Sequence, residues 1–487
     1  MDTMPNSTPK QDRYDAIVIG SGPNGLSAAI RLAQEGKSVL VVERADEPGG
    51  GTRTSELTLP GFHHDVCSTA HPMGLASPYL GTLPLEKFGL EWIQPELPMA
   101  QTLDPAHGHG DAVALFRSVE ETAEQFSSQD AAKYRSIFGP IVRDLPKLFG
   151  DLLGPAALPR HPIAVTRFGL QALTPASFYS GLMFDEEPAK TLFLGNAAHS
   201  IVPLTKPFTS AIGLMLQSAA HGVGWPVAKG GSKSIWKAMV ACLENLDGEV
   251  CTGIDVGQIE ELPKADSILF DTSPSAMVKM TGDRLPAGYK RRLLDYHHGP
   301  GVFKLDLALS EPIPWISDIC RRAGTIHLSG GADETVASEA ALYSNHPVDK
   351  PFQLVAQPAT FDPSRAPKGK HIAWTYCHVP PGWDGDATEP ILNQIERFAP
   401  GFRDTILATN AMSCADMERY NPNYIGGDIA CGASDFTQLL TRPIAKLDPY
   451  STPDPGIFLC SAATPPGAGV HGMCGYHAAQ SVLKKER

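Results

Sequence analysis

Short apolar runs alternate with helical patterns at the start of the chain. Residues 16–19 (AIVI) are too few for most helices and are rich in β-branched side chains, which predicts a buried strand. A helical pattern follows over residues 26–33 and ends before Gly36, and residues 38–42 (SVLVV) predict a second buried strand. This order of strand, helix and strand predicts a βαβ unit.

Hydrophobic periodicity predicts further elements along the chain. Strands are expected over residues 248–256, 265–272, 301–309, 372–380 and 456–460, and helices over residues 118–149, 235–243 and 476–483. Ser118, with Glu121 three positions later, is expected to cap the first of these helices. Residues 145–183 carry little charge and are interrupted by prolines. We expect short helices there that cover a substrate pocket, and contact with a membrane surface or a partner subunit is the alternative.

A glycine turn joins the first predicted strand to the first predicted helix and carries candidate chemistry. Gly20 makes the turn, Gly22 lets the backbone approach a pyrophosphate, and Gly25 lets helix and strand pack closely. The amides of the first helical turn and the helix dipole favour phosphate charge. Glu43 ends the second strand, about 20 residues later, where a carboxylate accepts hydrogen bonds from ribose hydroxyls. Together with Pro23 and Asn24 inside the turn, these residues predict one dinucleotide site.

A second glycine cluster follows the acidic residue at once. It is expected to approach the same pyrophosphate from the other side, and its candidate residues are Arg44, Gly50, Gly51, Thr52 and Arg53. This doubled arrangement resembles the FAD-binding start of the flavin amine oxidase and phytoene desaturase superfamily, so the resemblance implies FAD as the cofactor. In that superfamily the backbone near Val256 would hold adenine, and Thr272 would lie near the pyrophosphate.

The remaining candidates lie on loops and strands farther along the chain. A small-residue loop between a strand and a helix contains Ala463, His471, Gly472 and Met473, and its amides suit the part of a flavin that gains negative charge on reduction. His471, Lys304 and His378 are the candidate catalytic residues, and His71 is a candidate contact to the flavin. For Lys304 a solvated strand lysine is the alternative, for His378 a structural place on a half-buried sheet face, and for His71 an ordinary loop histidine.

Composition limits the class of protein. The 487 residues suffice for two or three domains, and the net charge of −13 argues against nucleic acid as a partner. Residues 1–13 are polar and predict a flexible tail. The sequence contains no run of about 18 apolar residues, so we expect no membrane span. The nine cysteines are scattered and form no CxxC, which favours free thiols in a reducing, cytoplasmic setting and argues against dithiol exchange. Nothing in the sequence predicts a metal site.

Several longer motifs carry a resemblance to one family over residues 14–485. These are IGSGPNGLSAA, VVERADEPGGGTRT, GPGVFKLDLALSEPIPW, WTYCHVP, ERYNPNYIGGDIACGA and AATPPGAGVHGMCGYHAA. With them the chain resembles the phytoene desaturase-like NAD(P)/FAD-dependent oxidoreductases, in the branch named after a pyridine nucleotide-disulphide oxidoreductase domain. Ser461 departs from relatives that carry glycine there, which leaves the local geometry of the loop open.

The resemblance implies an α/β fold with a discontinuous, Rossmann-like FAD-binding domain and an inserted α+β substrate domain. We expect residues 14–80, 222–295 and 421–487 in the FAD-binding domain. Residues 81–221 are expected to form a helical substrate part, and residues 296–420 a sheet.

An FAD-dependent dehydrogenase or desaturase is the leading hypothesis for function. It would move hydride from a C–H bond of a largely apolar or alicyclic organic substrate to flavin N5, with oxygen, a quinone or a carrier as the electron acceptor. A flavin amine oxidase, a redox-neutral isomerase that acts on reduced flavin, and a non-catalytic lipid-binding carrier on the same fold are the alternatives. The sequence leaves the oligomeric state and peripheral membrane contact open.

Overall fold

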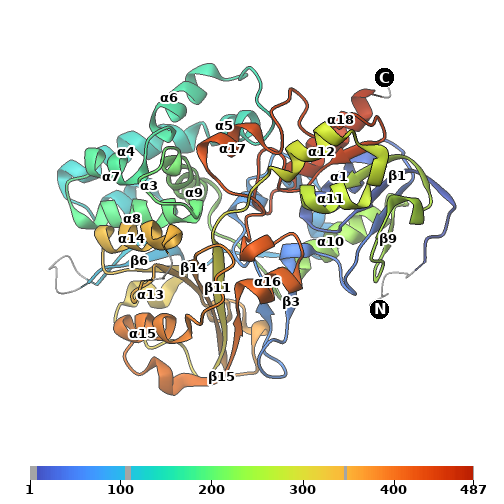
Figure 1. Ribbon diagram of the computed structural model, residues 1–487. Coiled ribbons are helices and arrows are strands. Elements are labelled where there is room, and N and C mark those ends of the chain that lie inside the picture. Colours follow the sequence, from blue (N-terminus) through green and yellow to red (C-terminus); the bar gives the residue numbers. More distant parts are fainter. Residues whose placement is uncertain (1–7, 105–110, 345–347, 486–487) are drawn as a thin grey trace.

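The computed structural model describes residues 8–104, 111–344 and 348–485 (Figure 1). Two sheets organise this part of the chain, with a layer of helices beside them. The expected tail, residues 1–13, lies partly outside the described residues; within it, the amide of Lys10 donates to Glu249 at 3.0 Å. No helix among the described residues is long and apolar enough to cross a membrane.

The first sheet has five parallel strands in the order β16-β10-β1-β2-β9. They are β1 (Arg13–Ile19), β2 (Val39–Val42), β9 (Glu249–Cys251), β10 (Lys264–Phe270) and β16 (Ile457–Leu459). The strands come from three distant stretches of the chain, as the sequence leads one to expect of a discontinuous domain. The expected strand over residues 248–256 is shorter in the structure, because the chain leaves the sheet after Cys251.

Helices cover both faces of this sheet. One face packs against α1 (Pro23–Ala33), α10 (Lys233–Glu244) and α18 (Met473–Lys485). The other face packs against α11 (Pro274–Met280) and α12 (Ala287–Leu294). With helices on both sides, the strands are apolar where they are covered, which is why the sequence contains continuous apolar runs such as residues 16–19 and 39–42.

The second sheet has seven strands in the order β15-β11-β14-β13-β12-β6-β7, and only the β12–β6 pair is parallel. Its strands are β6 (Leu97–Thr102), β7 (Ala112–Leu115), β11 (Gly301–Leu309), β12 (Ala323–Leu328), β13 (Gln353–Ala356), β14 (His371–Val379) and β15 (Ile406–Met412). One face buries residues such as Leu305 and Cys377 beside α15 (Thr388–Phe398) and α13 (Asp318–Arg322). Alternate residues therefore face the opposite way, toward the interior of the molecule.

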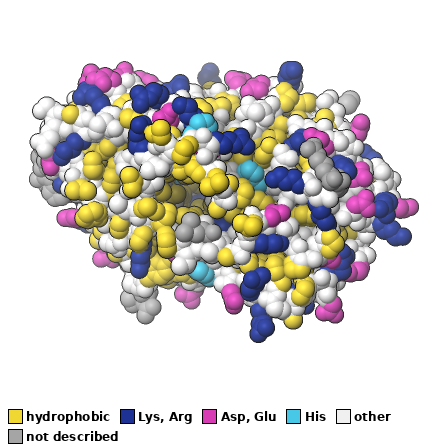
Figure 2. Space-filling model, turned by 90° about the horizontal axis from the view of Figure 1, so that it is seen from above, with side chains coloured by type: hydrophobic (Ala, Val, Ile, Leu, Met, Phe, Trp, Pro, Cys, Tyr) yellow, Lys and Arg dark blue, Asp and Glu magenta, His cyan; other side chains and the backbone are white. Residues whose placement is uncertain are grey.

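The helical part lies beside the second sheet at the left of Figure 1. It consists of α3 (Val119–Ala123), α4 (Ser128–Arg143), α5 (Leu145–Leu152), α6 (Pro162–Ala172), α7 (Ala176–Met183), α8 (Glu187–Ala197), α9 (Thr209–Val223) and α14 (Ala332–Ala340). The expected cap is present, because the Ser118 side chain accepts a hydrogen bond from the Glu121 amide. From above, exposed hydrophobic side chains gather on this face around a hollow (Figure 2).

Short elements complete the chain between these layers. They are β3 (Thr54–Ser55), β4 (His64–Asp65), α2 (Pro72–Leu75), β5 (Trp92–Ile93), β8 (Val227–Ala228), α16 (Cys414–Tyr420) and α17 (Phe436–Thr441). Single 3-10 turns lie at Gly50–Thr52, Leu80–Thr82, Leu85–Phe88, Ala198–Ser200, Ile259–Glu261, Gly282–Arg284, Ala341–Tyr343, Pro358–Thr360, Pro363–Arg365, Phe402–Thr405 and Ile425–Gly427.

Candidate functional site

One cavity of about 720 Å³ runs between the two sheets and under the helical part. At one end it is lined by the glycine turn before α1 and by the residues after β2 and β10, and at the other by α9 and strands β12, β13 and β14. Ligand sites in proteins commonly have volumes of about 300–1,000 Å³, so the cavity has the size of a binding site.

The glycines of the first turn are required by close packing. Gly20 has φ +101°, and a Cβ on it would lie 2.8 Å from the carbonyl oxygen of Asp271. A Cβ on Gly25 would lie 2.1 Å from the carbonyl oxygen of Gly20. No side chain fits at either position, so the turn brings the start of α1 close to the residues that follow β10.

Glu43 holds the turn together from the end of β2. Its Oε2 accepts hydrogen bonds from the Ser21 amide at 3.0 Å and the Ser21 hydroxyl at 2.6 Å. Its Oε1 accepts from the Ala45 amide at 2.9 Å and forms an ion pair with Arg53 at 3.2 Å. The carboxylate is thus part of the frame of the site as well as a cavity residue.

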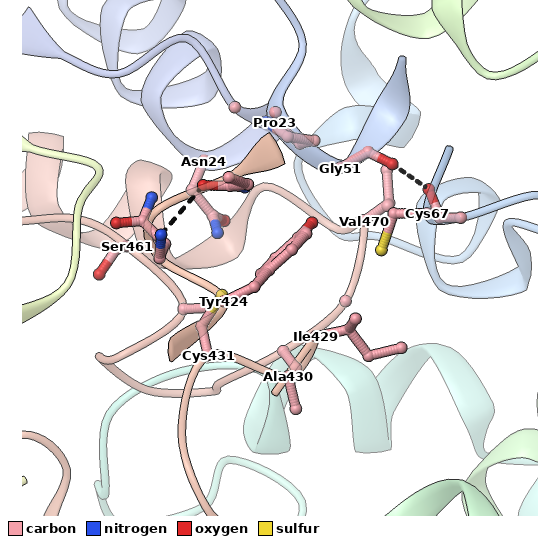
Figure 3. Close-up of a pocket in the computed structure, with 18 of the residues that line it drawn as sticks. Pro23, Asn24, Gly51, Cys67, Tyr424, Ile429, Ala430, Cys431, Ser461 and Val470 are labelled. Atoms are coloured by element: carbon pink, nitrogen blue, oxygen red, sulfur yellow. Dashed lines mark hydrogen bonds between the residues drawn. The ribbon is translucent and has the colours of Figure 1, made fainter. Parts of the chain in front are cut away.

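The second glycine cluster meets the first. Gly50 has φ +53°, and a Cβ on it would lie 3.1 Å from Gly22 Cα. The Tyr420 hydroxyl donates to the Gly50 carbonyl oxygen at 2.8 Å, and a Cβ on Gly51 would lie 2.6 Å from Tyr424 Oη. Figure 3 shows the ring of Tyr424 reaching across the cavity from the side of Cys431 toward Gly51.

Asp271 is a residue of this site that the sequence analysis missed. It follows β10, and its Oδ2 accepts a hydrogen bond from the Gly25 amide at 2.9 Å. Burial raises the pKa of this carboxyl to about 7, with the Glu43 charge acting in the same direction and the Gly25 and Gly22 amides acting against it. The signal in the sequence was its position beside Thr272, at the end of a predicted buried strand.

The C-terminal loop brings a second helix start to the first. A Cβ on Gly475 would lie 1.8 Å from the Asn24 carbonyl oxygen, and one on Gly472 would lie 2.1 Å from Ser27 Oγ. α1 and α18 therefore begin side by side, although about 450 residues separate them in the chain. Ser461 lines the cavity, and because its φ is not positive, a side chain is compatible with the backbone of the loop there.

His471 lies in this loop and lines the cavity. Its Nδ1 accepts a hydrogen bond from the Met473 amide at 3.1 Å, so in the neutral ring the proton is on Nε2. Burial lowers the pKa of His471 to about 4, which keeps the ring neutral near pH 7. In this state His471 is a hydrogen-bond donor at Nε2 and has no free lone pair for a base.

The cavity brings together most of the residues that the sequence singled out. Among its lining residues are Gly20, Gly22, Pro23, Asn24, Glu43, Arg44, Gly50, Gly51, Arg53, His71, Val256, Thr272, Ala463 and His471. Outside the lining are Gly25, Thr52, Lys304, His378, Gly472 and Met473. Gly25, Gly472 and Met473 act in the two turns as described, and the Thr52 hydroxyl donates to the Gly49 carbonyl oxygen at 2.7 Å.

Lys304 and His378 lie in the sheet beneath the cavity. Lys304 is 1 % exposed, forms a buried ion pair with Asp306, and places its Nζ 5.6 Å from the ring centre of Trp374. His378 Nδ1 lies 2.9 Å from Glu339 Oε1. The alternative of a solvated strand lysine does not hold, because Lys304 is buried. Their roles in catalysis stay predictions.

The other end of the cavity is an apolar chamber. Its lining includes Leu153, Ile201, Ile212, Met215, Leu216, Trp225, Leu354, Ala356, Trp374 and Tyr376. His199, which the sequence analysis also missed, lines the chamber beside Thr325. Of the segment expected to cover the pocket, residues 145–183, only Leu153 reaches the lining, and α9 supplies Ile212, Met215 and Leu216 instead.

Comparisons with known proteins extend over nearly the whole chain. A model of the NAD(P)-binding Rossmann-like domain matches residues 18–80. The pyridine nucleotide-disulfide oxidoreductase domain-containing protein 2 of Mus musculus is 24% identical over 97% of this chain and 93% of its own length. The lycopene-forming phytoene desaturase of Pseudescherichia vulneris is 24% identical over 94% of this chain and 96% of that protein. The chain is thus phytoene desaturase-like.

A solved structure shows the same fold. Cyclohexylamine oxidase from Brevibacterium oxydans superposes with a TM-score of 0.59 over 97% of this chain and 100% of its own, at 16% identity. It confirms the flavin amine oxidase-like fold class. The relatives above confirm the resemblance and, with it, the expectation of an oxidoreductase that uses FAD. The geometry fits this cofactor, since two glycine turns and two helix starts converge on one cavity.

Proposed function

We propose that the chain is an FAD-dependent dehydrogenase or desaturase of a largely apolar or alicyclic organic molecule. The observation that supports this most is the continuity of the cavity, which joins the paired glycine turns to an apolar chamber. A cofactor held at the turns would present its reactive end to a molecule in the chamber. Oxygen, a quinone or a protein carrier would take the electrons.

The residues that would hold FAD divide into three groups. The α1 turn and Asp271 would meet the pyrophosphate, and Glu43 and Val256, which also line the cavity, would meet ribose and adenine. Arg53, Tyr420 and Tyr424 close the second glycine cluster. The C-terminal loop with Ala463 and His471 covers the remaining side. When bound, FAD supplies the acceptor for a hydride from the substrate C–H bond.

The chain itself would position the substrate and control charge. The apolar side chains of α9 and β13 exclude water from the reacting end of the cavity. The His471 Nε2–H is a neutral donor at the loop where negative charge would develop on reduction. Lys304 and His378, our sequence candidates for proton transfer, could act only through residues that separate them from the cavity.

Anaerobic stopped-flow reduction tests the proposal. The purified protein should be yellow, and alicyclic substrates should bleach its flavin absorbance; reoxidation by oxygen and by quinones would then identify the acceptor. The proposal fails if dithionite reduces the bound flavin and no organic substrate does. Turnover only after dithionite reduction would point to an isomerase, and a colourless protein that does not bind added FAD would point to a carrier.

An amine oxidase is the second candidate, because aromatic rings line the chamber. Trp374 and Tyr376 are edge-to-face, with centres 5.1 Å apart, an arrangement that could enclose an ammonium group. Against it, the acidic residues in the described lining (Glu43, Asp255 and Asp271) all lie at the glycine-turn end. Release of hydrogen peroxide from amines would decide for this candidate.

A further inference from the structure

Two histidines form a contact at the wall of the apolar chamber. His199 Nε2 lies 3.0 Å from His327 Nε2, and the ring centres are 5.0 Å apart. His199 lines the cavity and is partly exposed, whereas His327 on β12 is fully buried behind it. Because Nε2 of His199 is taken up by His327, its Nδ1 is the ring nitrogen left for a molecule in the chamber.

Both rings are neutral at physiological pH. Burial lowers the pKa of His199 to about 3 and holds the pKa of His327 well below its usual range. His378, which faces the pair from β14, adds to the effect. One of the two Nε2 atoms must then carry a hydrogen and the other must accept it. The pair has two tautomeric arrangements, and they present opposite chemistry at His199 Nδ1.

Gln101 bears on which of the two arrangements forms, because its free acceptor lies near His327 Nδ1 without being bonded to it. Its Nε2 donates to the Thr102 carbonyl oxygen at 3.2 Å and to Ser329 Oγ at 3.0 Å, which fixes the amide with Oε1 as the free acceptor. Gln101 Oε1 and His327 Nδ1 are both buried without a hydrogen-bond partner among the described residues. Both also border Gly195, since a Cβ there would lie 2.0 Å from the first atom and 2.9 Å from the second.

Gln101 Oε1 is an acceptor without a donor, and a hydrogen on His327 Nδ1 would supply one. His327 Nε2 is then the acceptor of the pair, and His199 Nε2 is the donor. His199 Nδ1 remains as a bare acceptor. We propose that His199 is a specificity residue that accepts a hydrogen bond from a neutral hydroxyl group on an otherwise apolar substrate. Beside it, the only side-chain donor of Trp225 is already used, since Trp225 Nε1 donates to Thr325 Oγ1 at 2.9 Å.

The surrounding chemistry favours an alcohol over an amine or a plain hydrocarbon. An ammonium group would enter a chamber whose described lining has no carboxylate nearby, beside two histidines that burial keeps neutral. A plain hydrocarbon would leave His199 Nδ1 buried without a donor, which also costs binding energy. A hydroxyl group meets the acceptor, and the rest of the molecule contacts the apolar wall.

This inference rests on the proposed function for the identity of the chamber as the substrate site, but its test does not need turnover. Matched alicyclic probes are cyclohexanol with cyclohexanone, and 2-decalol with 2-decalone. Their binding to the FAD-loaded protein is measured by flavin difference spectra and by thermal shift. In the unaltered protein the alcohol of at least one pair should bind about fivefold to tenfold more tightly than its ketone.

Two variants locate the effect, with a third as the control. His199→Phe should abolish the preference for the alcohol and leave ketone binding within about twofold, because a ring of similar shape remains. Gln101→Met should reduce the preference without touching the ligand, because both tautomers become accessible; loss of packing alone would weaken alcohol and ketone equally. His63→Phe, on a loop outside the lining, should change neither.

The outcomes separate this inference from the proposed function. Equal binding of alcohol and ketone in both pairs, tighter binding of the ketones, or an unchanged preference in His199→Phe would overturn the role of His199. A protein that shows the expected preference but whose flavin no substrate reduces would sustain the binding site and refute the oxidoreductase. FAD content and melting temperature of each variant confirm that it is folded.

Discussion

Asp271 Oδ2 lies 2.9 Å from the amide nitrogen of Gly25, so a side chain carboxyl occupies the N-terminus of α1. The same helix start is where we place the pyrophosphate of FAD. Two negative groups at one helix start repel each other unless the carboxyl is protonated. Burial already raises the pKa of Asp271 to about 7, and the pyrophosphate would raise it further.

We therefore expect FAD binding to take up a proton. Above pH 7 the fraction of the free protein in which Asp271 is protonated falls by up to about tenfold per pH unit. Because only this fraction binds FAD well, the Kd for FAD should rise by the same factor. Asp271→Asn should bind FAD with little pH dependence and more tightly than the unaltered protein at pH 8.5. Fluorescence titration with FAD between pH 6 and 8.5 measures both. Asp255→Asn, an exposed lining residue, is the control, and an unaltered protein with a flat profile would contradict the expectation.

Glu43 should be required for FAD affinity through the frame of the turn. Glu43→Gln removes the charge that accepts hydrogen bonds from Ser21 and pairs with Arg53. A hydrogen bond to a charged group contributes about 1.5–3 kcal/mol, so the variant should lose about this much binding free energy. The Kd for FAD should rise by roughly tenfold to a hundredfold. Equilibrium dialysis provides the measurement, and the neighbouring Glu47→Gln should leave the Kd unchanged because its side chain is exposed.

Buried histidines should make the fold sensitive to acid. Burial lowers the pKa of His64 and His199 to about 3, and of His71, His221 and His471 to about 4. These values lie below the unfolded value of about 6.5, so the unfolded chain binds more protons between about pH 4 and 6.5. The free energy of unfolding should fall as the pH drops through this window.

One of these histidines offers a clean variant for the acid effect. His221→Gln should flatten the slope by up to about 1.4 kcal/mol per pH unit in urea unfolding between pH 6.5 and 5. The residue lies outside the cavity lining, and its Nε2 contacts the Tyr134 hydroxyl at 2.7 Å. His297→Gln, at an exposed histidine paired with Asp435, should keep the original slope. Equal slopes in all three proteins would argue against the burial effect.

The Lys304–Asp306 pair should stabilise the second sheet only as a pair. Lys304→Met leaves Asp306 buried without its cation and should lower the free energy of unfolding by about 3–5 kcal/mol. The double variant Lys304→Met with Asp306→Leu should recover most of this loss, because two apolar side chains replace two buried charges. Urea unfolding of the FAD-loaded protein measures the loss. If Lys304→Met is as stable as the unaltered protein, the pair has no structural role.

Local sequence patterns determined the first half of the candidate site. Strand, glycine turn, helix and acid lie within one continuous segment, so their spacing alone predicts how Gly20, Gly25 and Glu43 come together. The alternation along the strand expected over residues 372–380 likewise predicts that Trp374, Tyr376 and His378 share a face, because successive side chains of a strand point to opposite sides. In the structure, Trp374 and Tyr376 do line the cavity.

Only the tertiary structure decided which distant groups meet these local features. Three contacts join segments that are about 130 to 370 residues apart in the chain. They are Asp271 with the start of α1, Tyr420 with Gly50, and His199 with His327. The tertiary structure also decided that Lys304 is buried and forms an ion pair with Asp306, whereas a lysine on a strand is usually solvated. Periodicity reports whether a residue faces inward, but not what it faces, because that depends on how the two sheets and α9 pack across the cavity.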